Sequence, residues 1–184
     1  MTTRREFIGL TTASMALMAS GLKAQIVQSP RPLNILFLGG TGFLGPHQIE
    51  SALARGHNLT MFNRGRNAGM YGDRVEEIVG NRDNNIDDGL SALQGDRRWD
   101  VVIDNTASIP RWVEESARLL ANRASLYLYT SSISAYADSS KPDMDENAPV
   151  GQITDEEAAA VKTNRDITGD NYGPLKARCE EAAQ

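Results

Sequence analysis

The stretch GGTGFLG, Gly39 to Gly45, decides the fold class of this 184-residue chain. It follows a largely apolar run, residues 33–38, of the kind expected for a strand covered on both faces of a parallel sheet. Residues 48–55 then place apolar side chains at helical spacing and end at Gly56. A strand, a glycine-rich turn and a helix in this order are the context that a dinucleotide-binding fingerprint requires.

The glycines of this turn have separate expected roles. Gly39 permits the tight turn, Gly42 lets a pyrophosphate approach the backbone, and Gly45 lets the helix pack closely. The helix N-terminus offers free N–H groups and a positive dipole end to the phosphates. The predicted cofactor contacts here are Gly39, Gly40, Thr41, Gly42, Phe43, Leu44 and Gly45. The alternative is an ordinary glycine-rich turn of an α/β protein.

Strands and helices alternate along the chain after this turn. Further strands are expected at residues 58–62, 75–79, 99–104 and 126–129, and helices at 113–122 and from Tyr172 to Gln184. This alternation predicts right-handed βαβ units and an α/β, Rossmann-type, doubly wound parallel sheet with the order 3-2-1-4-5. The polar segment 137–170 is long for a loop, which indicates a functional lid or disorder, with a helix near 155–162.

Composition excludes several classes of function. The net charge is −5 and no long basic run is present, so a nucleic-acid partner is not expected. Cys179 is the only cysteine, which rules out an intrachain disulfide, and we interpret it as a packing residue. With two histidines at no ligand spacing, no metal site is expected.

The end of the second expected strand indicates which cofactor binds. A carboxylate there would bind the ribose of NAD, whereas an arginine favours the 2′-phosphate of NADP. This chain has Asn63 and Arg64, followed by Arg66, and no carboxylate. We therefore predict that Asn63 and Arg64 contact the cofactor and that NADP is preferred over NAD. The alternative is that both arginines are solvated loop charges.

The N-terminus carries the parts of an export signal. Residues 3–8, TRREFI, precede an apolar, small-residue stretch, and they resemble the bacterial twin-arginine signal. This resemblance implies export to the periplasm by the twin-arginine machinery, with cleavage near Ala24 or after Gly21. We expect a signal peptide at 1–24, a linker at 25–32 and a dinucleotide-binding domain at 33–184. The alternative is a tail with a chance arginine pair.

Two further motifs complete a family pattern. Tyr129-Thr130-Ser131-Ser132-Ile133-Ser134-Ala135-Tyr136 ends the fifth expected strand, and Tyr172-Gly173-Pro174-Leu175-Lys176 forms a Tyr-x-x-x-Lys. With the glycine turn, they resemble the short-chain dehydrogenase/reductase superfamily, and within it the extended or atypical NAD-dependent epimerase/dehydratase group. The resemblance covers most of residues 33–184.

This resemblance implies a catalytic triad of Ser132, Tyr172 and Lys176, with Ser131 as second choice for the serine. Tyr172 and Lys176 are four residues apart and share one helix face. An ammonium near the phenol lowers the phenol pKa, so that Tyr172 can serve as general acid or base. Ser132 would hold the reacting oxygen, and Tyr172 and Lys176 would also contact the cofactor.

The resemblance implies further cofactor contacts after the third and fourth strands. Asn81 and Arg82 fall near the expected adenine, although Asn81 stands where related sequences often have Asp. The contacts expected after the fourth strand are Asn105, Thr106 and Ala107. Both groups also read as ordinary turn residues.

The resemblance implies an NAD(P)-dependent oxidoreductase or epimerase/dehydratase acting on a hydroxyl or carbonyl substrate, sugar-like or other. A non-catalytic dinucleotide-binding module, serving regulation or interaction, is the alternative. The family runs on past the Tyr-x-x-x-Lys helix, so we expect a C-terminally truncated protein without the later strands. Uncovered apolar surface would then favour self-association, for example as a homodimer.

Overall fold

The computed structural model describes residues 28–105, 107–140 and 142–184. The expected export signal and Thr106, an expected cofactor contact, lie outside these ranges.

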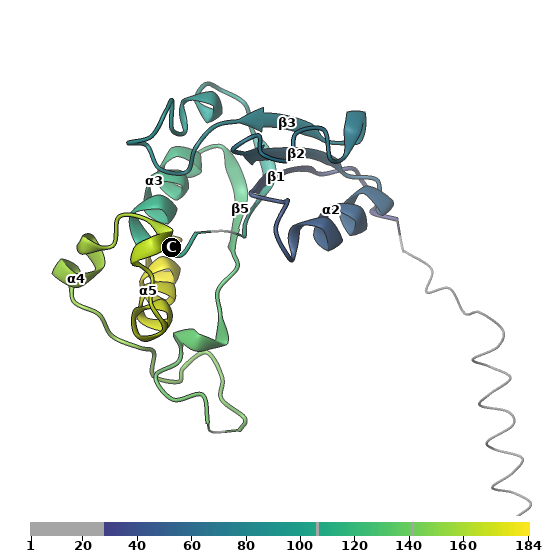
Figure 1. Ribbon diagram of the computed structural model, residues 1–184. Helices are drawn as coiled ribbons and strands as arrows, with labels where there is room; N and C mark the ends of the chain where they lie inside the picture. Colours follow the sequence, from purple (N-terminus) through teal and green to yellow (C-terminus); the bar gives the residue numbers. More distant parts are fainter. Residues whose placement is uncertain (1–27, 106, 141) are drawn as a thin grey trace, which may run out of the picture.

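Five parallel strands form one twisted sheet in the order β3-β2-β1-β4-β5 (Figure 1). The strands are β1 (Asn34–Leu38), β2 (Asn58–Asn63), β3 (Glu76–Val79), β4 (Trp99–Asp104) and β5 (Ala124–Tyr129). Phe37 in the central strand pairs with Met61 on one side and Ile103 on the other. The predicted fold class and strand order are confirmed, and β1 lies where the chain direction across the sheet reverses.

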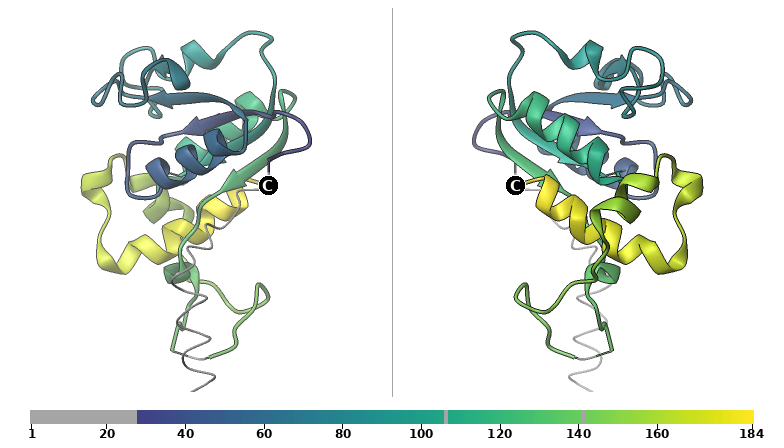
Figure 2. Two further views of the ribbon diagram at one scale, coloured as in Figure 1. Left: turned by 90° about the vertical axis from the view of Figure 1, so that its right-hand side faces the viewer. Right: turned by 90° about the vertical axis from the view of Figure 1, so that its left-hand side faces the viewer.

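Helices cover both faces of this sheet (Figures 1 and 2). Helix α2 (Gly45–Ala54) buries Ile49 against Phe37 and Met61 on one face. On the other face, Leu120 of α3 (Pro110–Leu120) packs with Leu36 and Val102. Helix α5 (Gly169–Ala182) lies beside α3. The apolar run of β1 is therefore buried from both sides, as its composition predicted.

Short elements complete the chain. They are the single-turn helices η1 (Gly72–Arg74), η2 (Ser91–Leu93), η3 (Ile133–Ala135) and η4 (Asn164–Asp166), and α4 (Asp155–Ala160). The polar segment before α4 projects away from the sheet (Figure 2). Helix α5 begins three residues before the expected Tyr172, because the Thr168 side chain caps it by accepting from Asn171 N. It ends at Ala182 and does not continue to Gln184.

Strand β5 forms one edge of the sheet and is only partly covered. Leu126 and Leu128 keep 49% and 46% of their surface exposed, so apolar surface is open on one face of this strand, as expected. Within the described ranges, no helix combines the length and the apolar character needed to cross a membrane.

Candidate dinucleotide site

The glycine turn between β1 and α2 is fixed from two sides. Gly39 N donates to Phe62 O at 2.9 Å, which ties the turn to the end of β2. The buried hydroxyl of Tyr71 donates to Gly40 O at 2.9 Å. Gly39 and Gly40 have φ angles of +100° and +122°, a region that side chains rarely allow. The turn is a preformed backbone surface at the C-terminal edge of the sheet.

Gly42 and Gly45 differ in what surrounds them. A Cβ atom at Gly45 would collide with the backbone carbonyl of Gly40, so the start of α2 needs glycine there. A Cβ at Gly42 would meet no atom within 4 Å. Packing therefore explains Gly45, whereas Gly42 faces open space, as expected for a surface that a phosphate approaches.

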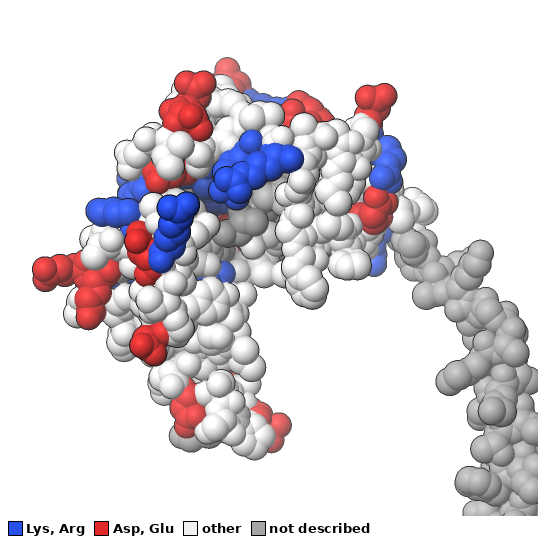
Figure 3. All heavy atoms as spheres, viewed as in Figure 1, with Lys and Arg blue, Asp and Glu red and all other residues white. Residues whose placement is uncertain are grey.

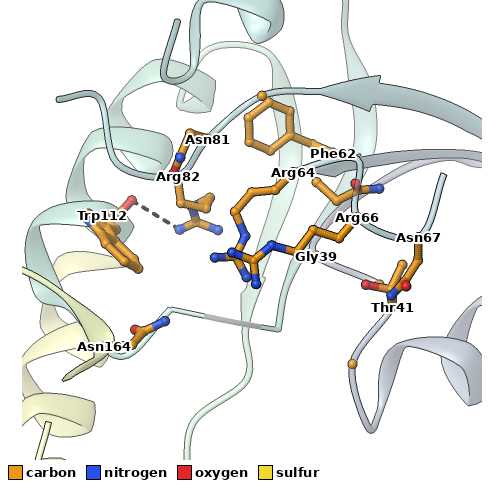
Figure 4. Close-up of a pocket in the computed structure, with 14 residues that line it drawn as sticks. Gly39, Thr41, Phe62, Arg64, Arg66, Asn67, Asn81, Arg82, Trp112 and Asn164 are labelled. Carbon is orange, nitrogen blue, oxygen red and sulfur yellow. Dashed lines mark hydrogen bonds between the residues drawn. The ribbon is translucent and has the colours of Figure 1, made fainter. Parts of the chain in front are cut away.

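A pocket of about 310 Å³ opens above this turn, near the lower end of the range of about 300–1,000 Å³ for ligand sites (Figure 4). Its lining combines the turn, the ends of β2 and β3, the start of α3 and η4. The lining residues are Gly39, Gly40, Thr41, Gly42, Phe62, Asn63, Arg64, Arg66, Asn67, Gly80, Asn81, Arg82, Trp112 and Asn164. Eight of the expected cofactor contacts are thus brought together: Gly39, Gly40, Thr41, Gly42, Asn63, Arg64, Asn81 and Arg82.

The charge of this lining is wholly positive. It holds three arginines and no carboxylate, and basic side chains gather in the middle of this face (Figure 3). Arg64 and Arg66 are exposed and point into the pocket (Figure 4), and neither makes an ion pair with another described residue. Asn63 holds their turn: its Oδ1 accepts from Gly65 N, and its Nδ2 donates to Glu77 at 2.7 Å.

Arg82 is the third arginine, and its charge is balanced. Its Nη1 and Nη2 donate to the two carboxylate oxygens of Asp104 at 2.7 and 2.8 Å. Nη2 also donates to Trp112 O at 3.1 Å and to Ser116 Oγ at 3.0 Å. Arg82 thus joins the loop after β3 to β4 and α3, and the net positive charge facing a ligand comes from Arg64 and Arg66.

The remaining expected cofactor residues lie outside this lining. Phe43 is 91% exposed and Leu44 42%. Asn105 uses both ends of its carboxamide, since its Nδ2 donates to Gln48 at 2.5 Å and its Oδ1 accepts from Thr130 at 2.8 Å. Ala107 is buried, and its carbonyl accepts from Tyr129 OH at 2.7 Å. Cofactor contact at these residues stays a prediction.

Lys176 is buried at the ends of β4 and β5. Its Nζ donates to Thr130 O at 2.7 Å and to Ala107 O at 3.3 Å, and lies 4.2 Å from the centre of the Tyr129 ring. Burial lowers the pKa of this lysine, while the charges of Asp104 and Glu180 act in the opposite direction. An ammonium has three N–H donors, so one remains after the two carbonyls are served.

The other two expected catalytic residues lie on adjoining segments. Tyr172 is in the first turn of α5, and Ser132 caps η3, where its Oγ accepts from Ser134 N at 3.1 Å. A Cβ atom at Gly173 would collide with the carbonyl of Ser134, so glycine lets α5 approach this segment. Ser131 is engaged elsewhere, donating its hydroxyl to Glu180.

The structure thus places the three expected catalytic residues on adjoining segments without a hydrogen bond between them. Within the described ranges, no hydrogen bond links Ser132, Tyr172 and Lys176 to one another, and none of them lines the pocket. The triad stays a prediction. No group of three or more metal-binding side chains occurs in the part of the chain that the structure describes.

Trp112 and Asn164 line the pocket without having been expected there. Trp112 lies in the first turn of α3, one residue before the helix that was expected at 113–122. Asn164 comes from the long polar segment, whose length pointed to a functional lid but to no particular residue.

No protein-family model matches this chain, and no curated protein matches it in sequence. Its structure is similar to the Bordetella bronchiseptica enzyme WbmG in complex with NAD, with a TM-score of 0.60 and 15% identity over 88% of this chain and 51% of that one. Vestitone reductase from alfalfa gives 0.55 and 20% identity over 82% and 51%.

UDP-N-acetylglucosamine 4-epimerase from Bacillus cereus gives a TM-score of 0.54 at 21% identity, over 82% of this chain and 51% of that one. This chain spans about half the length of the three structures. Over most of its length it therefore has the Rossmann-like fold of a reductase and an epimerase of known structure.

Proposed function

We propose that this chain is the dinucleotide-binding and catalytic unit of an NAD(P)-dependent oxidoreductase or epimerase/dehydratase. The observation that carries this proposal is the position of the pocket. It opens on the glycine turn after β1, where the strand order reverses, which is the place at which open α/β sheets bind ligands. The unfilled space above Gly42 and the lining without carboxylates fit a pyrophosphate.

NADP is the proposed cofactor. Arg64 and Arg66 follow the end of β2, where a 2′-phosphate would lie, and neither pairs with a carboxylate of the described residues. NAD is the alternative, and it is the dinucleotide bound in the WbmG structure. Titration of the chain with both dinucleotides decides between them. The double variant Arg64→Ala, Arg66→Ala should lose roughly tenfold or more in NADP affinity with little change for NAD, whereas Arg55→Ala should change neither.

The substrate is proposed to be a small hydroxyl or carbonyl compound of the sugar type. The nicotinamide supplies hydride transfer when bound. Tyr172 would then exchange the proton of the reacting oxygen, Ser132 would hold that oxygen, and Lys176 would favour the phenolate and offer its third N–H to a ribose hydroxyl.

Turnover can be followed at the reduced-nicotinamide absorbance band with a panel of sugars and ketones. Tyr172→Phe should abolish turnover and leave dinucleotide affinity unchanged, while Tyr136→Phe serves as the matched control. Turnover by the Tyr172→Phe variant at the unaltered rate would contradict this assignment.

A non-catalytic, regulatory dinucleotide-binding module is the second candidate. It is favoured by one observation: the Ser132 hydroxyl already accepts from Ser134 N, and Lys176 already serves two carbonyls. Tight NADP binding without turnover of any tested substrate would support this second function.

We also propose export by the twin-arginine route. A reporter fused after residue 32 should reach the periplasm, and replacement of both Arg4 and Arg5 by lysine should retain it in the cytoplasm. Export of the lysine variant at the original level would contradict this proposal.

A further inference from the structure

One turn of the long polar segment reaches the nucleotide pocket. Asn164 opens η4, and it lines the pocket together with Arg82 and Trp112 (Figure 4). All the other lining residues come from the sheet's strand ends, the loops after them and the start of α3. A segment that follows β5 in sequence therefore contributes to a site built around β1, β2 and β3.

Packing and capping fix the position of this turn. Val161, three residues before Asn164, is buried with Ile109 and Leu175 in one cluster. Thr163 N donates to Asp166 Oδ2 at 2.8 Å, and Thr163 Oγ1 accepts from Arg165 N at 3.2 Å, which completes a capping box. The turn is thus a preformed part of the pocket wall.

The same turn is tied to the helix that carries Tyr172. Asn171 Nδ2 donates to Asp166 O at 3.0 Å, and Asn171 Oδ1 accepts from Thr168 N at 2.7 Å. These two hydrogen bonds connect η4, which carries Asn164, to the first turn of α5, which carries Tyr172. A ligand held by Asn164 would therefore contact a turn that is bonded to the start of α5.

The side chain of Asn164 is available to a ligand. It is exposed, and its carboxamide makes no hydrogen bond with another described residue. Asn81 differs, because its Oδ1 already accepts from Asp83 N at 3.0 Å. One lone pair of the Asn81 carboxamide oxygen is therefore used within its own loop, whereas no described residue bonds the carboxamide of Asn164.

The position in the sheet indicates which end of a dinucleotide lies here. Lys176, the proposed catalytic lysine, donates to carbonyls just after β4 and β5, so the reacting end of a dinucleotide would lie there. The pocket extends from the glycine turn the other way, toward the ends of β2 and β3. A dinucleotide whose pyrophosphate rests on the turn would therefore place its purine nucleoside in this pocket.

We propose that Asn164 is a binding and specificity-determining residue that contacts the edge of the purine base, opposite the glycine turn. A carboxamide presents a donor and an acceptor side by side, which match the amino group and a ring nitrogen of adenine. This inference rests on the proposed dinucleotide function, and it adds a base-reading residue from the segment between β5 and α5.

Binding of NADP and of adenosine 2′,5′-bisphosphate to the chain and its variants tests this inference. Asn164→Ala should weaken both probes about 3- to 10-fold, the effect of losing one neutral hydrogen bond. Asn147→Ala, an exposed asparagine in the same long segment and outside the pocket, should change neither. Thermal melting of both variants at the original temperature would exclude a merely structural effect.

A second variant tests directly whether residue 164 recognises the base. Asn164→Asp keeps the acceptor and loses the donor, and its added charge opposes every phosphate-bearing probe alike. At the edge formed by N6 and N7, which a carboxamide matches, the hypoxanthine analogue of NADP offers only two acceptors (an oxygen replaces the amino group), and an aspartate can bond neither. The affinity ratio of NADP to this analogue should therefore rise about tenfold. An unchanged ratio, with Asn164→Ala binding like Asn147→Ala, would overturn the inference and leave the proposed function standing. Failure of the unaltered chain to bind any probe would overturn the proposed function itself.

Discussion

Arg82 and Asp104 form a buried, two-pronged ion pair at the wall of the pocket above the glycine turn. The Asp104 side chain is fully buried and that of Arg82 is 11% exposed. Tyr127 OH donates to Asp104 Oδ2 at 2.7 Å, so the pair belongs to a network that joins the loop after β3 to β4, β5 and α3. Removing one partner would leave an uncompensated charge in the interior.

Asp104→Asn should therefore lower the free energy of unfolding by about 3–5 kcal/mol, the usual cost of breaking a buried pair. Denaturant unfolding followed by circular dichroism measures this. The exposed pair of Arg74 with Glu50 is the matched control, and Glu50→Gln should leave the midpoint unchanged. Equal effects of the two variants would contradict a special role of the buried pair.

Gly42 and Gly45 should separate binding from folding. Gly45→Ala forces a Cβ against the Gly40 carbonyl, so it should cost about 1–3 kcal/mol of stability. Gly42→Ala meets no neighbour within 4 Å, so the melting temperature should hold. Its methyl group would occupy the space that a pyrophosphate needs, and NADP affinity should fall roughly tenfold or more. Undiminished affinity of Gly42→Ala would show that no phosphate rests on this turn.

Trp112 should report binding by its fluorescence. It lines the pocket. Trp99, by contrast, is 4% exposed and is the first residue of β4, so it lies at the amino ends of the strands, away from the pocket at their carboxyl ends. NADP should quench the emission of the chain, and Trp112→Phe should remove this response. Trp99→Phe should keep it. A response that depends on Trp99 would place the ligand elsewhere.

The sequence predicted what local pattern determines. Every strand was expected near its observed place, although the third was expected from a weaker pattern, residues 75–79, that contains two glutamates. Strand β4 was expected at its observed bounds, because its apolar run and the turn residues after it are local features of the sequence. The start of α5 was missed, because the Thr168 cap lies four residues before the expected start at Tyr172.

Contacts made by packing of distant segments could not be predicted. Asn164 lines the pocket because Val161 packs on Ile109 and Leu175. These three residues are far apart in the sequence, and no local sequence pattern predicts that they pack together. Arg82 was expected beside a cofactor, and it does line the pocket. Its guanidinium, however, donates to both carboxylate oxygens of Asp104, a pairing that only the three-dimensional structure shows. Arg64, by contrast, lines the pocket as its place directly after β2 indicated, and its contact with a cofactor stays a prediction.

Cys179 should be unreactive in the folded chain. It is fully buried beside Ala107 and Val113, and burial raises its thiol pKa to about 11. At pH 8 the thiolate fraction is then roughly 200-fold smaller than for a free cysteine of pKa about 8.5, before any steric protection.

Because Cys179 is the only cysteine, a disulfide reagent gives one signal that reports on α5, which also carries Tyr172 and Lys176. The reaction should be slow in buffer, complete in denaturant, and slower still with NADP bound, since a ligand held at Lys176 stabilises this helix. Rapid stoichiometric modification in buffer would contradict the packing of α5 against α3.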